Sequence, residues 1–274
     1  MTNKTVLITG CSSGIGRAAA ERFLDEEWTV YATTRNEDDL ADLAERGCRT
    51  DSLDVTSGED VARVVDRIDD EHRRLDCLVN NAGYGLYGPL EDIPVERLHE
   101  QFDVNLYGPH RLTRAVLPLL REREEGTIIN ISSIYGRVAT PGGGAYAGSK
   151  FALEAMSDAL RAEVDAFGID VVVVEPGSVE TGFQQRAGSE TESLVPGQEY
   201  DWVYDVIDDA VTVSGSLPVT IPPEEVAATI YDAASVSDPE PRYQVGQFTG
   251  LATAARFLPD RFRDRIFGLV RRLP

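Results

Sequence analysis

The chain has 274 residues and carries 47 Asp and Glu against 26 Lys and Arg, a formal net charge of −21 at pH 7. This excess of acid disfavours nucleic-acid binding, because phosphate recognition depends on a basic surface. Hydrophobic residues make up 42% of the chain, which excludes a disordered protein. The longest aliphatic run, 171–174, is too short to span a membrane. The three Cys and three His lack metal-ligand spacing and no secretory signal is visible, so we expect a cytoplasmic protein without a metal site.

Lysine is nearly absent, since Lys4 and Lys150 are the only two among the 26 cations. A solvated acidic surface that has lost its lysines is similar to those of proteins from salt-loving microbes, where salt screens the self-repulsion. The alternative is a mildly acidic protein with arginine-rich codon usage. We favour the halophilic origin.

Short β-branched runs alternate with helical patterns along the chain. The runs predict strands at 5–9, 29–33, 77–80, 127–132 and 170–174. The helical patterns lie at roughly 15–27, 38–46, 58–72, 94–121 and 145–167. This alternation predicts an α/β fold with a doubly wound parallel sheet of about seven strands and helices on both faces, in one domain over residues 1–274.

The C-terminal third departs from this alternation. Residues 183–222 are polar and loop-rich with aromatics in the middle, which suits a cover over a cleft. A helix is expected at 223–236, behind two prolines, and a strand in the segment RYQVG that follows residue 241.

A glycine-rich turn, TGCSSGIG at residues 9–16, follows the first predicted strand. Glycines at this junction let the backbone approach a pyrophosphate, whose charge is stabilised by the N-terminus of the next helix. The GxxxGxG spacing is weak evidence alone, but its place after the first strand predicts a nucleotide site. The residues expected to contact the cofactor here are Gly10, Ser12, Ser13, Gly14, Ile15 and Gly16.

The end of the second strand indicates which dinucleotide binds. An acidic residue there would hold the ribose 2′-hydroxyl of NAD, but this chain has Thr34-Arg35-Asn36. Arg35 can pair with a 2′-phosphate. The acids at 37–39 are explained as the first turn of a helix capped by Asn36. We therefore predict NADP(H) rather than NAD(H).

Tyr146 and Lys150 form a YxxxK motif whose i, i+4 spacing places both side chains on one face of a predicted helix. An ammonium beside a phenol favours the phenolate, which predicts a lowered pKa for Tyr146 and a role in proton transfer. The alternative is a helix-surface pair. With ten Tyr and two Lys in the chain, a chance match is rare.

Three further polar residues are candidates for the site. Ser132 and Ser133 stand at the end of the strand 127–132, where a hydroxyl could bind a substrate carbonyl. Because successive side chains of a strand point to opposite faces, one of the two serines points away from the cleft. Asn105 lies in a helical stretch, where it either caps a local distortion in the core or serves the site. Spacing alone leaves these alternatives open.

Together these motifs resemble those of the short-chain dehydrogenase/reductase family over residues 4–182. The resemblance implies a catalytic set of Asn105, Ser133, Tyr146 and Lys150, with the thirteen-residue gap to Tyr146 selecting Ser133 over Ser132. Ser13 departs from those NADP-preferring members that carry a basic residue in the glycine turn. The family also implies an adenine contact at Asp54 and Val55 and a segment that steadies the central sheet at Asn81, Ala82 and Gly83. It further implies a segment that holds the nicotinamide, at Pro176, Gly177, Val179 and Thr181.

The sequences of several segments are similar to those of a branch of the family that contains hydroxysteroid and retinol dehydrogenases. This similarity implies a fairly apolar ketone, aldehyde or alcohol as substrate. In that family the tyrosine exchanges a proton with the carbonyl oxygen, the lysine binds the nicotinamide ribose, and the asparagine holds a water. We expect a homodimer or homotetramer. Side chains expected near the substrate are Tyr84, Leu86, Tyr87, Tyr135, Val138, Phe183 and Trp202. Each of them could equally belong to ordinary core or oligomer packing.

Two other functions compete with this interpretation. A non-catalytic NADP-sensing scaffold could share the fold, although such proteins typically lose the Tyr or the Lys. A reductase of carrier-bound thioesters would have to bring an acidic carrier to this acidic surface.

The segment 251–274 is basic, with six Arg against two Asp, and its apolar residues form one stripe. Such a helix could lie on an anionic membrane or dock on the acidic body or a neighbouring subunit. We favour docking, because molar salt screens attraction to lipid whereas apolar burial survives. The stripe comprises Leu258, Phe262, Ile266, Leu269, Val270 and Leu273.

Overall fold

The centre of the protein is a parallel sheet of seven strands in the order β3-β2-β1-β4-β5-β6-β7. The computed structural model describes residues 4–195, 197–214, 220–246 and 249–270. The predicted doubly wound α/β fold is confirmed. The strands are β1 (Thr5–Thr9), β2 (Thr29–Thr34), β3 (Arg49–Ser52), β4 (Cys77–Asn80), β5 (Gly126–Ile131), β6 (Ile169–Pro176) and β7 (Arg242–Val245).

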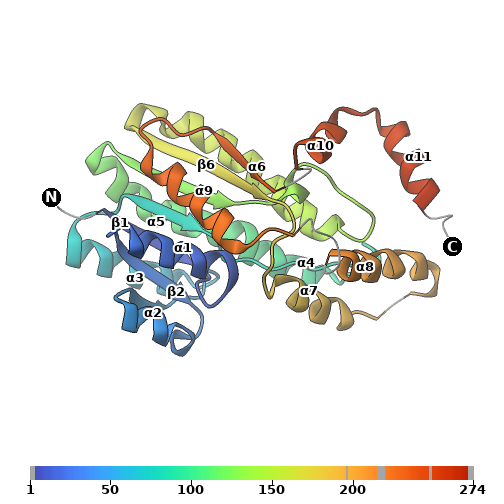
Figure 1. Ribbon diagram of the computed structural model, residues 1–274, viewed down its shortest axis with the longest axis horizontal. Helices are drawn as coiled ribbons and strands as arrows, with labels where there is room; N and C mark the ends of the chain where they lie inside the picture. The colour runs from blue at the N-terminus through green and yellow to red at the C-terminus, as the bar shows by residue number, and fades with distance from the viewer. Residues whose placement is uncertain (1–3, 196, 215–219, 247–248, 271–274) are drawn as a thin grey trace.

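Helices cover both faces of the sheet (Figure 1). One face packs against α1 (Gly14–Asp25), α2 (Ala41–Arg46) and α9 (Pro223–Ser235). The other packs against α3 (Gly58–His72), α5 (Gly108–Arg123) and α6 (Gly144–Val164). Successive side chains of a strand point to opposite faces, so Val6 and Ile8 join the first core while Leu7 joins the second. This explains why the three central residues of β1 are all apolar.

The predicted helix over 94–121 is divided in the structure. It consists of α4 (Val95–Phe102), a π-helical turn (Asp103–Tyr107) and α5. Insertions of this kind often mark functional sites, and here the turn contains Asn105.

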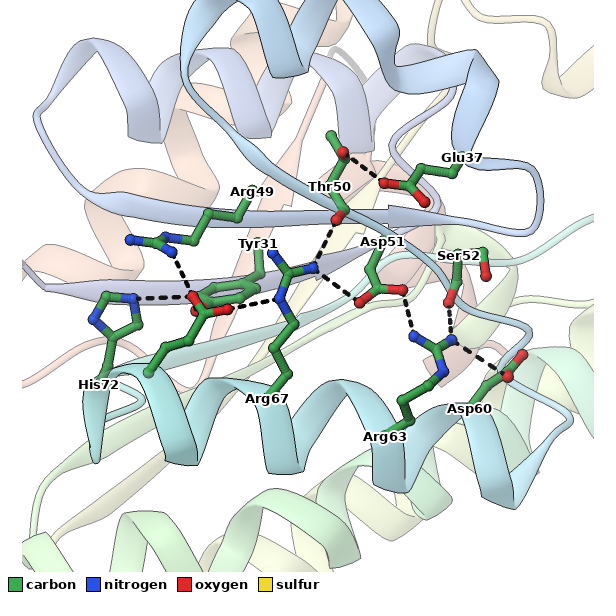
Figure 2. A network of polar contacts seen from close by, with 11 residues as sticks. Tyr31, Glu37, Arg49, Thr50, Asp51, Ser52, Asp60, Arg63, Arg67 and His72 are labelled. Atoms are coloured by element: carbon green, nitrogen blue, oxygen red, sulfur yellow. Dashed lines mark hydrogen bonds and ion pairs between the residues drawn. The ribbon is translucent and has the colours of Figure 1, made fainter.

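The edge strand β3 has no apolar pattern and was not predicted from the sequence. Its residues RTDS are held by arginines of α3, as Figure 2 shows. Arg67 donates from Nη1 to the Thr50 carbonyl at 2.9 Å and to Asp51 Oδ2 at 3.0 Å, and Arg63 binds Asp51 and the Ser52 carbonyl. Side chains of a neighbouring helix thus satisfy polar groups of an edge strand, which would otherwise invite pairing with another chain.

The cover segment is more regular than its composition indicates. Residues 183–222 are predicted to be loop-rich, but the structure contains α7 (Phe183–Glu192) and α8 (Asp201–Ser214). Asp92 anchors α8 and the residues before it, because its Oδ2 accepts hydrogen bonds from the Gly197 N–H at 3.1 Å and the Tyr204 hydroxyl at 2.8 Å. Helix α7 is held by the Thr191 hydroxyl, which donates to the Tyr87 carbonyl at 3.0 Å. Burial against the body, which local composition does not reveal, stabilises these helices.

The C-terminal arm contains α10 (Thr249–Ala254) and α11 (Asp260–Val270), which extend beyond the sheet near α8 (Figure 1). Phe262 is half exposed. The side chains of Ile266, Leu269 and Val270, and all of Leu273, lie outside what the structure describes, so docking of the stripe stays a prediction. Within the described residues, no helix has the length and apolar content needed to cross a membrane.

The network at β3 generates a pH-dependent prediction. Glu71 of α3 accepts hydrogen bonds from Arg67 Nε at 2.8 Å and the Tyr31 hydroxyl at 2.7 Å, and these lower its pKa from the ordinary 4.5 to about 2. The stabilisation is therefore present above pH 4.5 and is lost as the pH falls towards 2. We expect Glu71→Gln to lower the free energy of unfolding at pH 7 by about 1 kcal/mol.

Urea unfolding at several pH values measures this effect. The difference from the wild type should close between pH 4.5 and about 2. Asp66→Asn, at an exposed position of α3 without an ion pair in the described part of the chain, is the control and should differ little. A pH-independent difference would contradict the role of the Glu71 charge.

Candidate active site

The carboxyl ends of β1 and β4 are joined by polar contacts between Thr9 and Asn81. The Thr9 hydroxyl oxygen accepts hydrogen bonds from the N–H groups of Asn81 and Ala82, both at 3.0 Å. In return, Asn81 Nδ2 donates to the carbonyls of Thr9 at 2.8 Å and Gly10 at 3.1 Å. Asn81 and Ala82 thus hold the glycine turn against the end of β4.

The N-terminus of α1 fits a phosphate-bearing ligand. Gly10 and Gly14 take the left-handed conformation, with φ of +74° and +58°, which only glycine adopts without strain. Within the described residues, Ser13 makes no side-chain capping bond and the first turn of α1 has no acid. By contrast, α3 is capped by Ser57 and carries two acids in its first turn. The free N–H groups and helix dipole of α1 therefore remain for an anion.

Gly16 allows the closest backbone approach at the turn. A Cβ atom there would lie 2.3 Å from the Gly10 carbonyl oxygen and 2.4 Å from Asn81 Nδ2. Any side chain would displace the turn or break the bonds of Asn81. The third glycine of the motif is therefore needed for packing, not for backbone freedom.

Ser133, Tyr146 and Lys150 meet at one end of the cleft. Ser133 caps the short 3₁₀ turn η3 (Ile134–Gly136), where its Oγ accepts the Tyr135 N–H at 3.2 Å, and it hydrogen-bonds with Tyr146. Tyr146 and Lys150 stand one turn apart on α6, with Lys150 Nζ 5.7 Å from the centre of the Tyr146 ring. The ammonium donates to the Ile131 carbonyl at 2.8 Å.

Burial dominates the ionisation of this group. The sequence predicts that Lys150 lowers the pKa of Tyr146, but burial raises that pKa above its ordinary value, and the hydrogen bond with Ser133 opposes the rise only in part. Burial also lowers the pKa of Lys150 to about 8, against the attraction of Glu154. The two pKa values shift in these directions because the phenolate and the ammonium both lose their hydration in this buried position. Tyr146 is thus a neutral phenol at pH 7.

Asn105 both occupies a backbone distortion and connects to the site. In the π-helical turn, its Nδ2 donates to the Tyr84 carbonyl at 2.9 Å and to Ser149 Oγ at 3.1 Å, while its Oδ1 accepts the Tyr84 N–H at 3.1 Å. It therefore ties the loop after β4 to α6. The water that the family resemblance assigns to this residue stays a prediction.

One cleft of about 1090 Å³ gathers the predicted site. Every predicted cofactor-binding residue lines it except Gly16, which lies behind the turn, and every catalytic candidate except Asn105. Ser132 also borders it, but Ser132 Oγ lies on the side of Gly136 and Glu154, away from Tyr146. The structure thereby distinguishes the two adjacent serines.

The end of the cleft where adenine is expected carries Arg35 and Asp54. Arg35 is exposed directly after β2. Burial raises the pKa of Asp54, but hydrogen bonds from the Thr56 N–H at 2.9 Å and hydroxyl at 2.7 Å hold it below its ordinary value, with help from Arg35 and Arg111. An ionised carboxylate and an exposed guanidinium therefore stand at this end.

Aromatic rings enclose Tyr146. The centroids of Tyr87, Tyr135 and Phe183 lie 5.6, 5.7 and 5.6 Å from that of Tyr146, and Tyr84 and Trp202 also line the cleft as expected. Leu86 and Val138 are not among the residues of the cleft wall that the structure describes. Leu86 is fully buried in the core cluster that also contains Tyr84, so the alternative of ordinary core packing holds for it.

Other lining residues were missed in the sequence. Arg97, Arg186 and Glu190 form a charged edge in which Arg97 pairs with Glu190, and Phe267 of α11 reaches the cleft from the C-terminal arm. They come from α4, α7 and α11, so no local motif connects them. Phe267 lies outside the apolar stripe predicted for the arm, so that pattern gave no signal for it.

Comparisons with known proteins agree with this geometry. The family model "short chain dehydrogenase" matches residues 4–192. An uncharacterized oxidoreductase, YbbO of Escherichia coli, is 37% identical over 96% of this chain and 93% of its own length. An NADPH-dependent 3-dehydrocapnine reductase of Ornithobacterium rhinotracheale is 34% identical over 95% of each chain. A 3-ketodihydrosphingosine reductase of Bacteroides thetaiotaomicron is 33% identical over 99% and 100%.

Solved structures are similar as well. A short-chain dehydrogenase from Streptomyces avermitilis superposes with a TM-score of 0.83 at 32% identity, over 98% of this chain and 96% of its own. A serine dehydrogenase complexed with NADP+ gives a TM-score of 0.78 at 28% identity, over 89% and 95%. The chain belongs to the short-chain dehydrogenase family and is an oxidoreductase with a nicotinamide cofactor.

The contact at Gly16 predicts the effect of one added methyl group. Gly16→Ala should lower the free energy of unfolding by about 1–3 kcal/mol and weaken dinucleotide binding, because the turn has to move. Gly58→Ala, at the first residue of α3 where a Cβ meets nothing within 4 Å, is the matched control and should change neither. Urea unfolding and cofactor titration measure both, and wild-type behaviour of Gly16→Ala would refute the packing role.

Proposed function

We propose that this protein is an NADP(H)-dependent carbonyl reductase or alcohol dehydrogenase that acts on a fairly apolar ketone, aldehyde or alcohol. The observation that carries the proposal is the meeting of Ser133, Tyr146 and Lys150 in the cleft whose other end is the phosphate-accepting N-terminus of α1.

Ser133, Tyr146 and Lys150 have separate roles in the reduction of the carbonyl. Bound nicotinamide supplies the hydride. Ser133 donates a hydrogen bond that orients and polarises the substrate carbonyl. Tyr146, kept protonated by burial, donates its phenolic proton to the oxygen that gains charge. Lys150 binds the nicotinamide ribose and supports return of the proton, with a pKa near 8 that lets it exchange protons near neutrality. The aromatic rings exclude water.

The preference for NADP(H) is supported by Arg35. It is exposed at the cleft directly after β2, and Thr34 stands where an acid would bind a 2′-hydroxyl. The relative named as NADPH-dependent and the neighbour solved with NADP+ agree with this preference.

The substrate class is supported by the lining and by two relatives. Tyr84, Tyr87, Tyr135 and Phe183 give the substrate end a largely aromatic wall, which suits apolar compounds. The reductases of 3-dehydrocapnine and 3-ketodihydrosphingosine are named for compounds that carry a carbonyl at position 3. We propose reduction of a ketone as the first reaction to test.

We also propose the wider setting of this activity. The charge of −21 and the presence of only two lysines support a halophilic protein. The three free cysteines support a reducing, cytoplasmic setting. We propose that residues 1–274 act as one domain in a homodimer or homotetramer, with 183–222 as the substrate cover. The kinship to hydroxysteroid and retinol dehydrogenases belongs to the same proposal.

Removal of one hydroxyl tests the proposal. NADPH consumption is measured in molar KCl against a panel of ketones and aldehydes. Tyr146→Phe should lower kcat by about 10²–10⁴-fold and leave NADPH affinity nearly intact, because only the proton donor is lost. Tyr107→Phe removes a hydroxyl from an exposed ring outside the cleft and is the control. Loss of NADPH affinity with most turnover retained would refute the role of Tyr146, and a wild type without turnover would favour the scaffold.

The cofactor preference has a separate test. Arg35→Ala should weaken NADPH binding by about 1.5–3 kcal/mol, as expected for charge-assisted hydrogen bonds to phosphate, and should leave NADH binding unchanged. Arg35→Lys should fall between, since it keeps the charge but loses the two-pronged geometry. Calorimetric titration of both dinucleotides decides the matter. A wild type that prefers NADH would overturn the interpretation.

A further inference from the structure

Four charged side chains, two of them buried and two partly buried, lie next to the candidate catalytic residues and are not used by the proposed mechanism. We call Arg137, Glu154, Glu175 and Arg242 the buried charge cluster. They come from the segment after η3, from α6, from β6 and from β7. Glu154 and Glu175 are 4% and 1% exposed, and the side chains of Arg137 and Arg242 are 14% and 24% exposed.

Each guanidinium of the cluster contacts both carboxylates. Arg137 Nε lies 2.7 Å from Glu175 Oε1, and Arg137 Nη2 lies 3.6 Å from Glu154 Oε2. Arg242 Nε lies 3.1 Å from Glu154 Oε2 and 3.5 Å from Glu175 Oε1. Gln244 Nε2 donates to Glu175 Oε2 at 3.0 Å. Two arginines are therefore paired with two buried carboxylates.

Three members of the cluster are close in sequence to the functional residues. Glu154 stands one helical turn after Lys150 and two after Tyr146 on the same helix, α6. Arg137 follows Ser133 by four residues across η3. Glu175 directly precedes Pro176, where the segment expected to hold the nicotinamide begins. The cluster thus joins the three segments whose spacing decides whether carbonyl, phenol and nicotinamide align.

The contact between the Ser133 turn and α6 leaves no free space. A Cβ atom on Gly136 would lie 2.6 Å from Ser132 Oγ and 3.0 Å from Glu154 Cγ. Ser132 Oγ and Glu154 Oε1 are buried, and within the described residues neither has a hydrogen bond of standard geometry. The Ser132 hydroxyl and the Glu154 carboxylate nevertheless lie close to each other. Burial raises the pKa of Glu154, and the Ser132 hydroxyl opposes that rise.

Stability alone is a poor explanation for such a cluster. Desolvation of buried ions offsets most of their attraction, and well-packed apolar residues of similar size often serve stability as well. Charged hydrogen bonds do, however, fix distance and direction, and a misplacement of about 1 Å at a reacting centre can cost about 100-fold in rate.

We propose that the buried charge cluster is a positioning device in which Arg137 holds the Ser133 turn and the 176–181 segment at a fixed distance from Tyr146 and Lys150. The inference rests on the proposed function, because it concerns the alignment of that site. Arg137 is its central positioning residue, since it bridges the carboxylates of β6 and α6.

The double variant Arg137→Met/Glu175→Gln tests this without leaving an unpaired buried charge, because it removes one charge of each sign. Calorimetry measures binding of NADPH and of 2′,5′-ADP, which fills only the adenosine end, and a coupled assay measures kcat with the carbonyl compound the wild type reduces fastest. We expect NADPH affinity to fall about fivefold and kcat about tenfold or more. Affinity for 2′,5′-ADP should not change, because that end lies at Arg35.

The control is Asp158→Asn, which removes a charge that pairs with Arg242 and Arg161 at the exposed rim. It should leave all three quantities unchanged. A folded double variant with wild-type affinities and kcat would overturn the inference, as would an equal loss for both ligands. If the wild type prefers NADH, NADH and ADP replace the two ligands. Absence of turnover in the wild type would count against the proposed function alone, and the two affinities would still decide the positioning role.

Discussion

The cleft depends on how the polar backbone groups at the carboxyl ends of β1 and β4 are satisfied. Parallel strands end at one edge of the sheet, and their last N–H and C=O groups need partners. Thr9 and Asn81 supply these partners for each other's strand. Their contacts place the glycine turn against Asn81, so that only a glycine fits at position 16. They also direct the uncapped N-terminus of α1 into the cleft. The loop after β4 then reaches Asn105, and through it α6.

Burial governs the chemistry at the opposite end of the cleft. It stabilises the neutral forms of both Tyr146 and Lys150, raising one pKa and lowering the other. A neutral phenol suits donation of a proton to a substrate oxygen. Two carboxylates behind this end of the cleft, Glu154 and Glu175, are paired with arginines.

Sequence patterns predicted the regular part of the fold closely. The bounds of β1, β4 and α3 agree with the runs at 5–9, 77–80 and 58–72, because apolar periodicity reflects burial directly. The failures share a cause. β3 is held by side chains of α3, α8 by Asp92, and α7 by the contact of Thr191 with Tyr87. Such tertiary contacts override local composition.

In the site, too, local motifs predicted some features and tertiary contacts determined the others. Family motifs identified Ser133, Tyr146 and Lys150, and the structure brings these three together. The pKa of Tyr146 was predicted in the wrong direction, since sequence spacing reveals a neighbouring charge but not the loss of water around it. The buried charge cluster was not predicted at all. Its members lie between residues 137 and 242 on four elements, and each alone has the appearance of an ordinary surface charge.

The central claim is that hydride passes from the nicotinamide to a carbonyl carbon in this cleft. The most direct measurement uses NADPH deuterated at carbon 4 of the nicotinamide, prepared as each of the two epimers, with the best ketone of the panel and mass spectrometry of the alcohol formed. The account predicts one deuterium on the carbinol carbon for one of the epimers and none for the other. Consumption of NADPH with no deuterium in the product from either epimer would contradict it.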